Sequence, residues 1–198
     1  MKTPSLRRSD WLDHALEVLL EEGIDGLRVE PLARSLGVTK GSFYWHFRDR
    51  DDLLDSVLEY WVDEMTVRIR DEMQARGGAP EQRLWDLMCR LMQDDRSRFE
   101  LAIRSWAAFD PKATAAVRGA DHLRLECLAA LFLEMGFDSD EAHMRARTLM
   151  GHVLAEPLLC TSDEPDERMA QNRLRHAMLT ARATPSELLM SGPHSRQH

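Results

Sequence analysis

The sequence predicts an all-α protein. Leu, Ala and Met, which favour helices, together number 59, whereas Val and Ile, which favour strands, number 11. Apolar residues recur at the three- and four-residue spacing of amphipathic helices, and glycines and prolines separate the segments. Hydrophobic residues make up 43% of the 198 residues and charged residues 30%, a globular balance. The composition therefore disfavours a sheet protein and a disordered chain.

Three short helices are expected in the first 47 residues. The first follows a Ser9 cap, and the second covers residues 29–36. Gly37 ends the second helix, and Thr39 can cap the third, which we expect to reach residue 47. Three helices of this length, the last two joined by a glycine turn, predict a helix-turn-helix unit.

Longer helices are predicted in the rest of the chain. A capping box of Asp49 and Asp52 opens a helix that runs to the break at residues 77–80. Further helices are expected at residues 81–93, 96–109, 112–135, 138–156 and 167–182, and Asp138 with Glu141 signals the N-terminus of the helix at 138–156. We therefore expect a DNA-binding domain over residues 1–50, a larger helical domain over 51–183 and a disordered tail over 184–198.

Charge is unevenly distributed along the chain. The formal net charge is −8, yet the basic residues between positions 28 and 50 outnumber the acidic ones by five to two. A local positive face on an acidic body can still bind DNA, because phosphate neutralisation depends on the charges at the contact. The overall charge argues against a generally basic nucleic-acid coat protein.

No segment indicates secretion or a membrane. The longest apolar run covers residues 127–133, far short of the roughly 20 residues that span a bilayer. Cys89, Cys127 and Cys160 are widely spaced and odd in number, which favours reduced thiols that pack as small apolar residues. We expect a cytoplasmic protein with no membrane partner, and a redox-sensing cysteine is the alternative reading of the thiols.

The third predicted helix carries the strongest functional signal. Its outer surface presents short hydrogen-bond donors near its N-terminus, which suit the base edges of a DNA major groove, and arginines flank it. The candidate DNA-binding residues are Arg28, Thr39, Lys40, Gly41, Ser42, Tyr44, Trp45, His46, Arg48 and Arg50.

Residues 38–53, VTKGSFYWHFRDRDDL, resemble the signature of the tetracycline-repressor (TetR) family of transcriptional regulators. The resemblance covers roughly residues 9–55. It implies that Tyr44 and His46 contact DNA phosphates and that Arg50 takes the place of a phosphate-contacting lysine. Arg28 departs from the pattern, because many members have a helix-capping threonine there. Either the cap comes from elsewhere or Arg28 reaches the DNA backbone.

The resemblance also implies a larger domain that binds a small molecule and dimerises through its last two long helices. Carried over to this chain, the dimer surface would lie on residues 115–134 and 140–156. Ordinary core packing explains the same apolar pattern equally well. The candidate interface residues are Leu123, Leu128, Leu131, Ala142, Ala146, Leu149 and Val153.

Aromatic and methionine residues of the larger domain are candidates for an effector pocket. They offer a large apolar area, so a hydrophobic effector, with aromatic character, is expected if they line a cavity. Plain core packing is the equal alternative. The candidates are Trp61, Met65, Trp85, Met88, Phe99, Ile103, Trp106 and Phe109.

No motif indicates an enzyme, a cofactor or a metal site. HExxH, GxSxG and phosphate-cradling glycine loops are absent, and His122, His143 and His152 lack metal-ligand spacing. We therefore expect a homodimeric repressor that a small-molecule effector releases from operator DNA, with promoter activation as a minor alternative. The competing class is a helical interaction or small-molecule-binding protein without specific DNA recognition.

Overall fold

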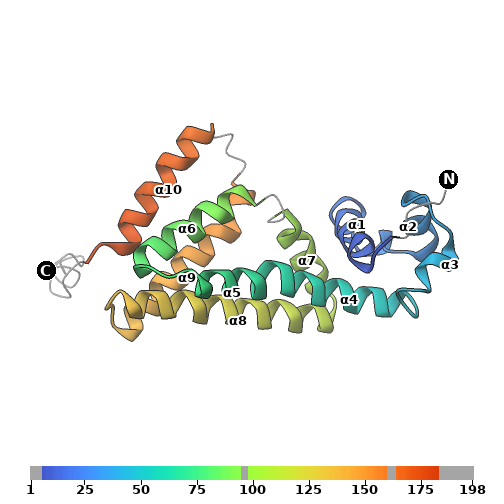
Figure 1. Ribbon diagram of the computed structural model, residues 1–198, viewed down its shortest axis with the longest axis horizontal. Helices are drawn as coiled ribbons and strands as arrows, with labels where there is room; N and C mark the ends of the chain where they lie inside the picture. The colour runs from blue at the N-terminus through green and yellow to red at the C-terminus, as the bar shows by residue number, and fades with distance from the viewer. Residues whose placement is uncertain (1–5, 95–97, 160–163, 183–198) are drawn as a thin grey trace, which may run out of the picture.

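The regular elements of the described chain are all helical. The computed structural model describes residues 6–94, 98–159 and 164–182, and no strand occurs within them (Figure 1). The all-α prediction is therefore confirmed. The elements are α1 (Arg8–Glu22), the 3-10 turn η1 (Ile24–Gly26), α2 (Val29–Ser35), α3 (Lys40–Phe43), α4 (Arg50–Val62), the π-helical turn η2 (Asp63–Val67), α5 (Arg68–Ala75), α6 (Pro80–Gln93), α7 (Phe99–Ala107), α8 (Pro111–Glu134), α9 (Ser139–Ala155), the 3-10 turn η4 (Glu156–Leu158) and α10 (Pro165–Thr180).

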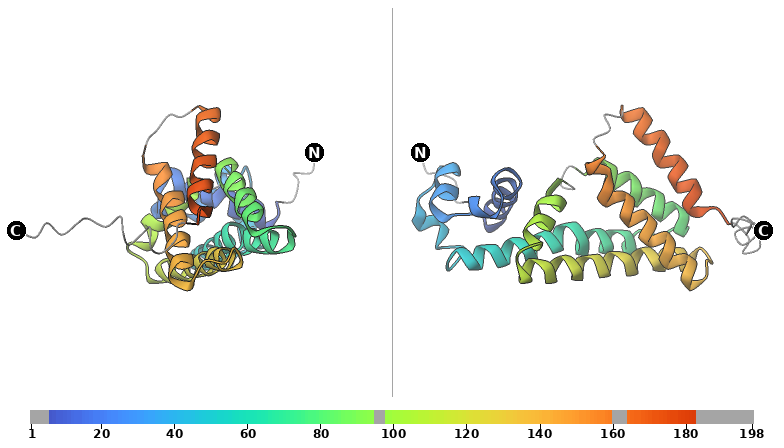
Figure 2. Two further views of the ribbon diagram at one scale, coloured as in Figure 1. Left: turned by 90° about the vertical axis from the view of Figure 1, so that its left-hand side faces the viewer. Right: turned by 180° about the vertical axis from the view of Figure 1, so that it is seen from behind.

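The molecule is elongated along a pair of long helical rods. Helices α4 and α5, joined by η2, form one rod, and α8 runs alongside it (Figures 1 and 2). The unit of α1, α2 and α3 sits at one end of the rods, whereas α6, α9 and α10 cover the other end. Helix α7 lies between the two groups. None of the described helices is long and apolar enough to cross a bilayer.

The predicted aspartate caps of the long helices are confirmed. The Asp49 carboxylate accepts from the Asp52 N–H at 2.8 Å, and the Asp138 carboxylate accepts from the Glu141 N–H at 2.9 Å. The predicted Ser9 cap is wrong, because α1 already begins at Arg8. A carboxylate two residues inside the helix closes that N-terminus instead.

Two expectations about helix length were also incorrect. Helix α3 ends at Phe43, and the residues up to Phe47 continue as turns. The helix predicted from Asp49 to the glycine break is interrupted by η2, although the rod continues through it. In both places the apolar residues stay on the buried face of the segment. The apolar spacing in the sequence therefore did not reveal the early end of α3 or the π-helical turn. Residues 184–198, expected to be disordered, lie outside the described part of the chain.

Two hydrophobic clusters hold the helices together. The first extends without a break from Trp11 and Phe43 in the N-terminal unit to Trp61 in α4 and Ile103 in α7. The second joins α5, α6, α8, α9 and α10 around Phe132. The N-terminal unit therefore shares its core with the larger domain instead of folding around a core of its own.

Five residues predicted to form a dimer interface are buried inside the single chain, and ordinary core packing is the correct reading. Ala142, Ala146 and Leu149 of α9 pack against Leu128 and Leu131 of α8 in the second cluster. Such residues have no surface left to offer a second copy. The remaining two, Leu123 and Val153, line an internal cavity. Helical periodicity identifies the buried face of a helix but not the element that covers it.

A glutamate at Ala146 tests this correction. The Ala146 side chain is 1% exposed, so Ala146→Glu buries an unpaired carboxylate and should destabilise the fold by about 3–5 kcal/mol. Urea unfolding followed by circular dichroism measures the change. The matched control is Arg147→Glu at the exposed neighbouring position, where the change should stay within about 0.5 kcal/mol. A stable Ala146→Glu protein that only dissociates would restore the original interface.

Candidate nucleic-acid interface and ligand cavity

A glycine turn fixes the angle between α2 and α3. Gly37 has φ +69°, a left-handed conformation that side chains other than glycine rarely adopt. The Gly37 N–H donates to the Arg34 carbonyl at 3.0 Å, and the Val38 N–H donates to the Ala33 carbonyl at 2.9 Å. These two hydrogen bonds end α2 and turn the chain so that α3 follows directly.

Aromatic packing holds α3 against α1. The Trp11 ring meets Phe43 and Phe47 edge-on, with centroid separations of 5.5 Å and 6.4 Å. All three side chains are almost completely buried. With its inner face fixed in this way, the outer face of α3 and of the turn after it points away from the protein.

The predicted DNA-binding residues of α3 lie together on that outer face. Ser42 and His46 are half-buried at its edge, and the other five are exposed. Trp45 is 88% exposed, an unusual position for a large ring. The face so formed combines hydroxyl, ammonium and aromatic groups, and comprises Thr39, Lys40, Gly41, Ser42, Tyr44, Trp45 and His46.

Lys40 is paired within the chain. Its Nζ lies 2.9 Å from Glu30 Oε1 on α2, and both side chains are at least half exposed. The hydrogen bond from Lys40 lowers the pKa of the Glu30 carboxyl and raises the pKa of the Lys40 ammonium. An exposed pair of this kind contributes little to stability. Lys40 can therefore leave Glu30 at small cost when a stronger acceptor approaches.

Arg50 does not point outward as the resemblance implied. Its Nε donates to the Leu27 carbonyl at 2.6 Å, and its Nη2 donates to the Ile24 carbonyl at 2.9 Å. The Arg50 guanidinium therefore links the start of α4 to the segment that precedes α2. A lysine has a single ammonium and cannot reproduce this forked contact, so the replacement changes more than it keeps.

The two other flanking arginines are exposed. Arg28 is the N-cap residue of α2 but makes no side-chain cap bond, so the expected threonine cap has no substitute there. The Arg48 side chain is 83% exposed, with Nη2 3.4 Å from the Asp52 carboxylate. Arg48 directly follows the turn after α3, whereas Arg28 lies at the start of α2.

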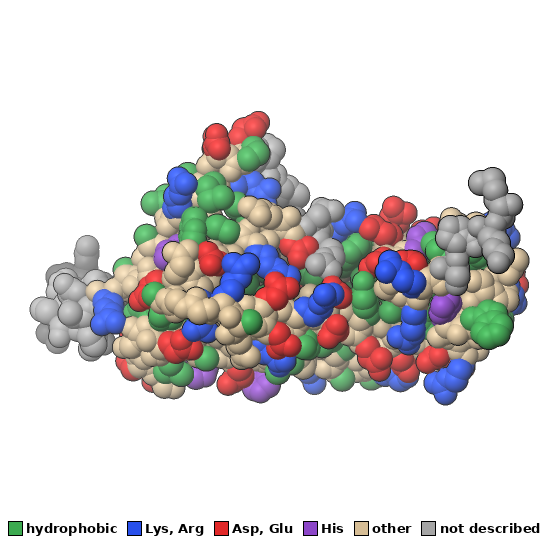
Figure 3. All heavy atoms as spheres, in the orientation of Figure 1, with side chains coloured by type: hydrophobic (Ala, Val, Ile, Leu, Met, Phe, Trp, Pro, Cys, Tyr) green, Lys and Arg blue, Asp and Glu red, His purple; other side chains and the backbone are tan. Residues whose placement is uncertain are grey.

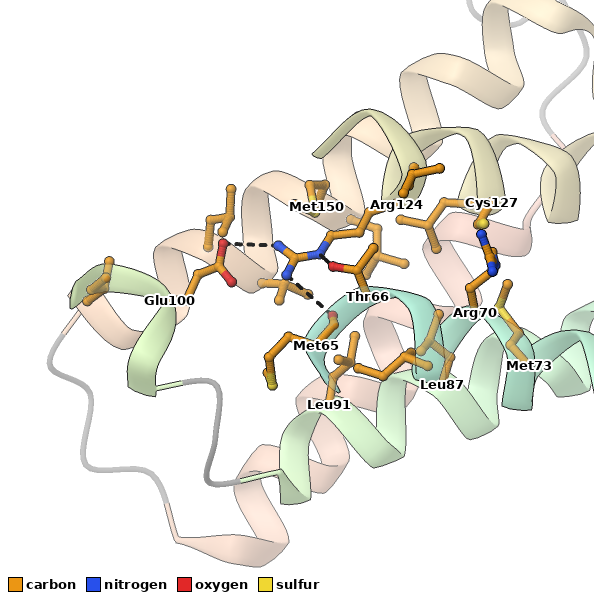
Figure 4. Close-up of a pocket in the computed structure, with 17 residues that line it drawn as sticks. Met65, Thr66, Arg70, Met73, Leu87, Leu91, Glu100, Arg124, Cys127 and Met150 are labelled. Carbon is orange, nitrogen blue, oxygen red and sulfur yellow. Dashed lines mark hydrogen bonds and ion pairs between the residues drawn. The ribbon is translucent and has the colours of Figure 1, made fainter. Parts of the chain in front are cut away.

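An apolar cavity lies between the rods of the larger domain. Its volume is about 100 Å³, and α5, α6, α8, α9 and η2 contribute most of its lining (Figure 4). The described lining side chains are mainly Leu, Met, Ile and Val, with none of them aromatic. Its polar groups are Thr66, Arg70, Glu100 and Arg124, none of which the sequence pattern had singled out.

Seven of the eight predicted pocket residues do not line this cavity, and only Met65 does. Trp61, Phe99 and Ile103 are packed in the first cluster, and Met88 is packed in the second. Trp85 stacks edge-on with His176 at 5.5 Å. Trp106 and Phe109 border a shallow hollow between α1 and α7, where Phe109 is 91% exposed. Large rings at helical spacing fill cores, so they mark packing more often than cavities.

The thiols and histidines offer no second site. Burial raises the pKa of Cys89 and of Cys127, which keeps these thiols protonated and unreactive at neutral pH. Cys160 lies outside the described residues. No group of three or more His, Cys, Asp or Glu side chains within the described ranges could hold a metal ion.

Helices α1, α2 and α3 form a helix-turn-helix unit with a larger helical domain appended, and sequence comparison finds a family that matches this unit. Residues 12–57 match the family of bacterial regulatory proteins, tetR family. The tetracycline repressor protein class D of Escherichia coli is 44% identical over 52 residues, covering 26% of this chain and 24% of the repressor. The regulator AcrR of Shigella flexneri is 36% identical over 52 residues, with the same coverage. The N-terminal unit of the chain is therefore similar to that of tetR-family transcriptional regulators.

The likeness to solved structures extends over nearly the whole chain. A transcriptional regulator from Rhodococcus sp. Rha1 has a TM-score of 0.67 at 24% identity, covering 88% of this chain and 96% of that one. A TetR/AcrR-family regulator from Thermobifida fusca has a TM-score of 0.62 at 19% identity, covering 90% and 98%. At these identities the likeness establishes the fold alone. The chain spans only about a quarter (24%) of the length of the class D repressor and of AcrR.

Replacing Arg50 tests its structural contacts. Arg50→Gln removes two charged hydrogen bonds and leaves the carbonyl of the buried Leu27 unpaired, so the fold should lose about 1–3 kcal/mol. Arg48→Gln removes the same charge from an exposed position and serves as the control. Urea unfolding of the two variants should separate them clearly. Equal stabilities would show that the Arg50 contacts do not support the fold.

Proposed function

We propose that the protein is a homodimeric transcriptional repressor that binds operator DNA through the outer face of α3 and leaves it when a small, mainly hydrophobic molecule fills the cavity. The observation that carries the proposal is the solvent-exposed face of Lys40, Tyr44 and Trp45 over a buried aromatic core. A helix presented in this way fits the major groove, where its N-terminal residues meet base edges.

Within this interface, Lys40 is the candidate base reader and Arg48 the candidate phosphate contact. Lys40 is the first residue of α3, where a lysine can reach guanine acceptors once it leaves Glu30. Arg48 lies beyond the end of α3 and precedes α4, at the margin of the face. Contacts of the second kind add affinity without sequence information. Arg50 is not among the proposed DNA contacts, because its guanidinium donates to backbone carbonyls.

Affinity measurements on two variants separate these roles. Lys40→Ala should weaken the preferred operator by about 1–3 kcal/mol and relax selectivity at one position of each half-site. Arg48→Ala should weaken all sequences alike and lower the salt slope by about one unit per subunit. Gel shifts against the operator and its point variants, across a salt series, measure both effects. Indistinguishable profiles would refute the division of roles, and salt-insensitive binding without sequence preference would favour the interaction-module alternative.

A second copy of the chain is proposed to cover an apolar stripe on α10. Apolar side chains are visible over α10 in Figure 3. Ala170 and the apolar residues four, seven and eight positions after it are exposed, and Leu174 is 66% and Met178 76% accessible. The start of α9 lies beside the end of α10, because Arg145 Nη1 donates to the Leu179 carbonyl at 2.7 Å. Met144 on α9 is also exposed. The proposed interface comprises Met144, Ala170, Leu174, Ala177, Met178 and Ala181.

Dimerisation matters to the DNA proposal because of operator geometry. Two recognition helices must reach half-sites about one helical turn apart, roughly 34–36 Å. Occupancy of the cavity can change that separation, because its wall includes η2 and α5, which continue the helix that carries the N-terminal unit. A differential affinity of the effector for the two arrangements supplies the coupling.

Charged substitutions on the stripe test the dimer. Leu174→Glu with Met178→Glu places two like charges in the proposed interface, so sedimentation should show monomer where the unaltered protein is a dimer. Operator affinity should fall because the half-sites are no longer bound together. Phe109→Glu puts one such charge on an even more exposed apolar position distant from α10, and this variant should remain dimeric. A dimer that survives the double change would overturn this interface.

A further inference from the structure

The rod that carries the N-terminal unit is irregular where it meets the cavity. The π-helical turn η2 separates α4 from α5, and two of its residues, Met65 and Thr66, are buried in the cavity wall. Single π-helical turns inside α-helices occur frequently at functional sites. Thr66 is 3% exposed, so its hydroxyl must find a partner inside the protein.

One side chain of α8 supplies that partner and several others. Arg124 Nε donates to Thr66 Oγ1 at 3.0 Å, and Nη2 donates to the Met65 carbonyl at 3.3 Å (Figure 4). Nη1 donates to Glu100 Oε1 of α7 at 3.0 Å. The guanidinium also lies over the Trp61 ring of α4, 5.1 Å from its centroid. Arg124 thus links α4, η2 and α7 from a single position at the polar end of the cavity.

The polar end of the cavity favours an incoming acceptor. A guanidinium has five N–H donors, and the bonds above occupy three of those on Arg124. Glu100, the carboxylate among the described lining residues, already accepts from both Arg104 and Arg124, at 2.8 Å and 3.0 Å. An ammonium group entering the cavity would therefore find its counter-charge occupied. Arg124 keeps one further N–H on each of Nη1 and Nη2, and these two donors can serve the oxygens of an incoming carboxylate even though Glu100 and Asp121 lie beside the guanidinium.

We propose that the effector is an aliphatic carboxylate whose head group binds Arg124 and whose chain fills the apolar cavity. This inference rests on the proposed function, in which the cavity is the effector site. The lining is aliphatic and thioether, which suits a flexible chain better than a ring. The volume of about 100 Å³ limits the occupant to a short chain, since a cavity of roughly 150 Å³ accommodates benzene.

Binding of three matched probes tests the ligand class in the unaltered protein. Hexanoate, 1-hexanol and hexylamine share one chain length and differ in the charge of the head group. Titration by isothermal calorimetry at pH 7 should give a dissociation constant for hexanoate at least about tenfold lower than for the other two, as expected of a charge-assisted bond. Equal or tighter binding of the alcohol or the amine, or binding of none of the three, would overturn the proposal.

Two variants test whether Arg124 binds the carboxylate. Arg124→Gln should bring the hexanoate-to-hexanol affinity ratio close to one. Arg70→Gln removes the same charge elsewhere in the cavity wall, where Arg70 is bonded to Asp71, and should preserve the ratio. Thermal unfolding checks that both variants are folded. If Arg124→Gln does not fold, Arg124→Lys replaces it, with a hexanoate-to-hexanol affinity ratio about tenfold smaller than that of the unaltered protein expected. Persistence of the full ratio without Arg124 would refute its role.

The same probes separate this inference from the proposed function. Hexanoate that binds through Arg124 and lowers operator affinity in a gel shift supports both. Hexanoate that binds in the same way but leaves operator affinity unchanged supports the ligand class and contradicts effector release. Operator release by hexylamine alone contradicts the ligand class and supports effector release.

Discussion

The packing of Trp11 between Phe43 and Phe47 is the constraint on which the rest of the structure depends. These edge-on contacts hold α3 on α1 and leave its opposite face to solvent. The Trp11 indole N–H is buried without a partner among the described residues, a cost of about 1–3 kcal/mol that the ring contacts must exceed. From Trp11 the same cluster continues through Trp61 to α7, so the orientation of the recognition surface and the packing of the larger domain are set together.

Electrostatic interactions are local in this acidic molecule. Charges of both signs are interspersed over the face seen in Figure 3, and many are paired within the chain. Arg104 and Arg124 are balanced by Glu100 and Asp121 in one partly buried network. The pair of Lys40 and Glu30 differs because both groups are exposed. Because both partners are in contact with water, this pair can be broken at small cost.

The features predicted correctly from the sequence were those that nearby residues determine. An aspartate cap and a glycine turn involve partners within a few positions, so Asp49, Asp138 and Gly37 could be recognised directly. The interface and pocket predictions failed because helical spacing shows that Ala146 or Trp106 is buried without showing what buries it. The polar end of the cavity joins residues up to 59 positions apart, a relation that no local pattern contains.

The unbroken first cluster has a consequence for how this chain can be recombined with its relatives. Leu53 and Val57 of α4 and Ile103 of α7 complete the core around Trp11, although they lie beyond the helix-turn-helix. An N-terminal unit that ended at residue 50 would expose its part of that core to water. Exchange of the N-terminal unit with that of a relative, whether by evolution or by engineering, must therefore transfer matching surfaces on α4 and α7. The unit that can be exchanged is larger than the helix-turn-helix itself.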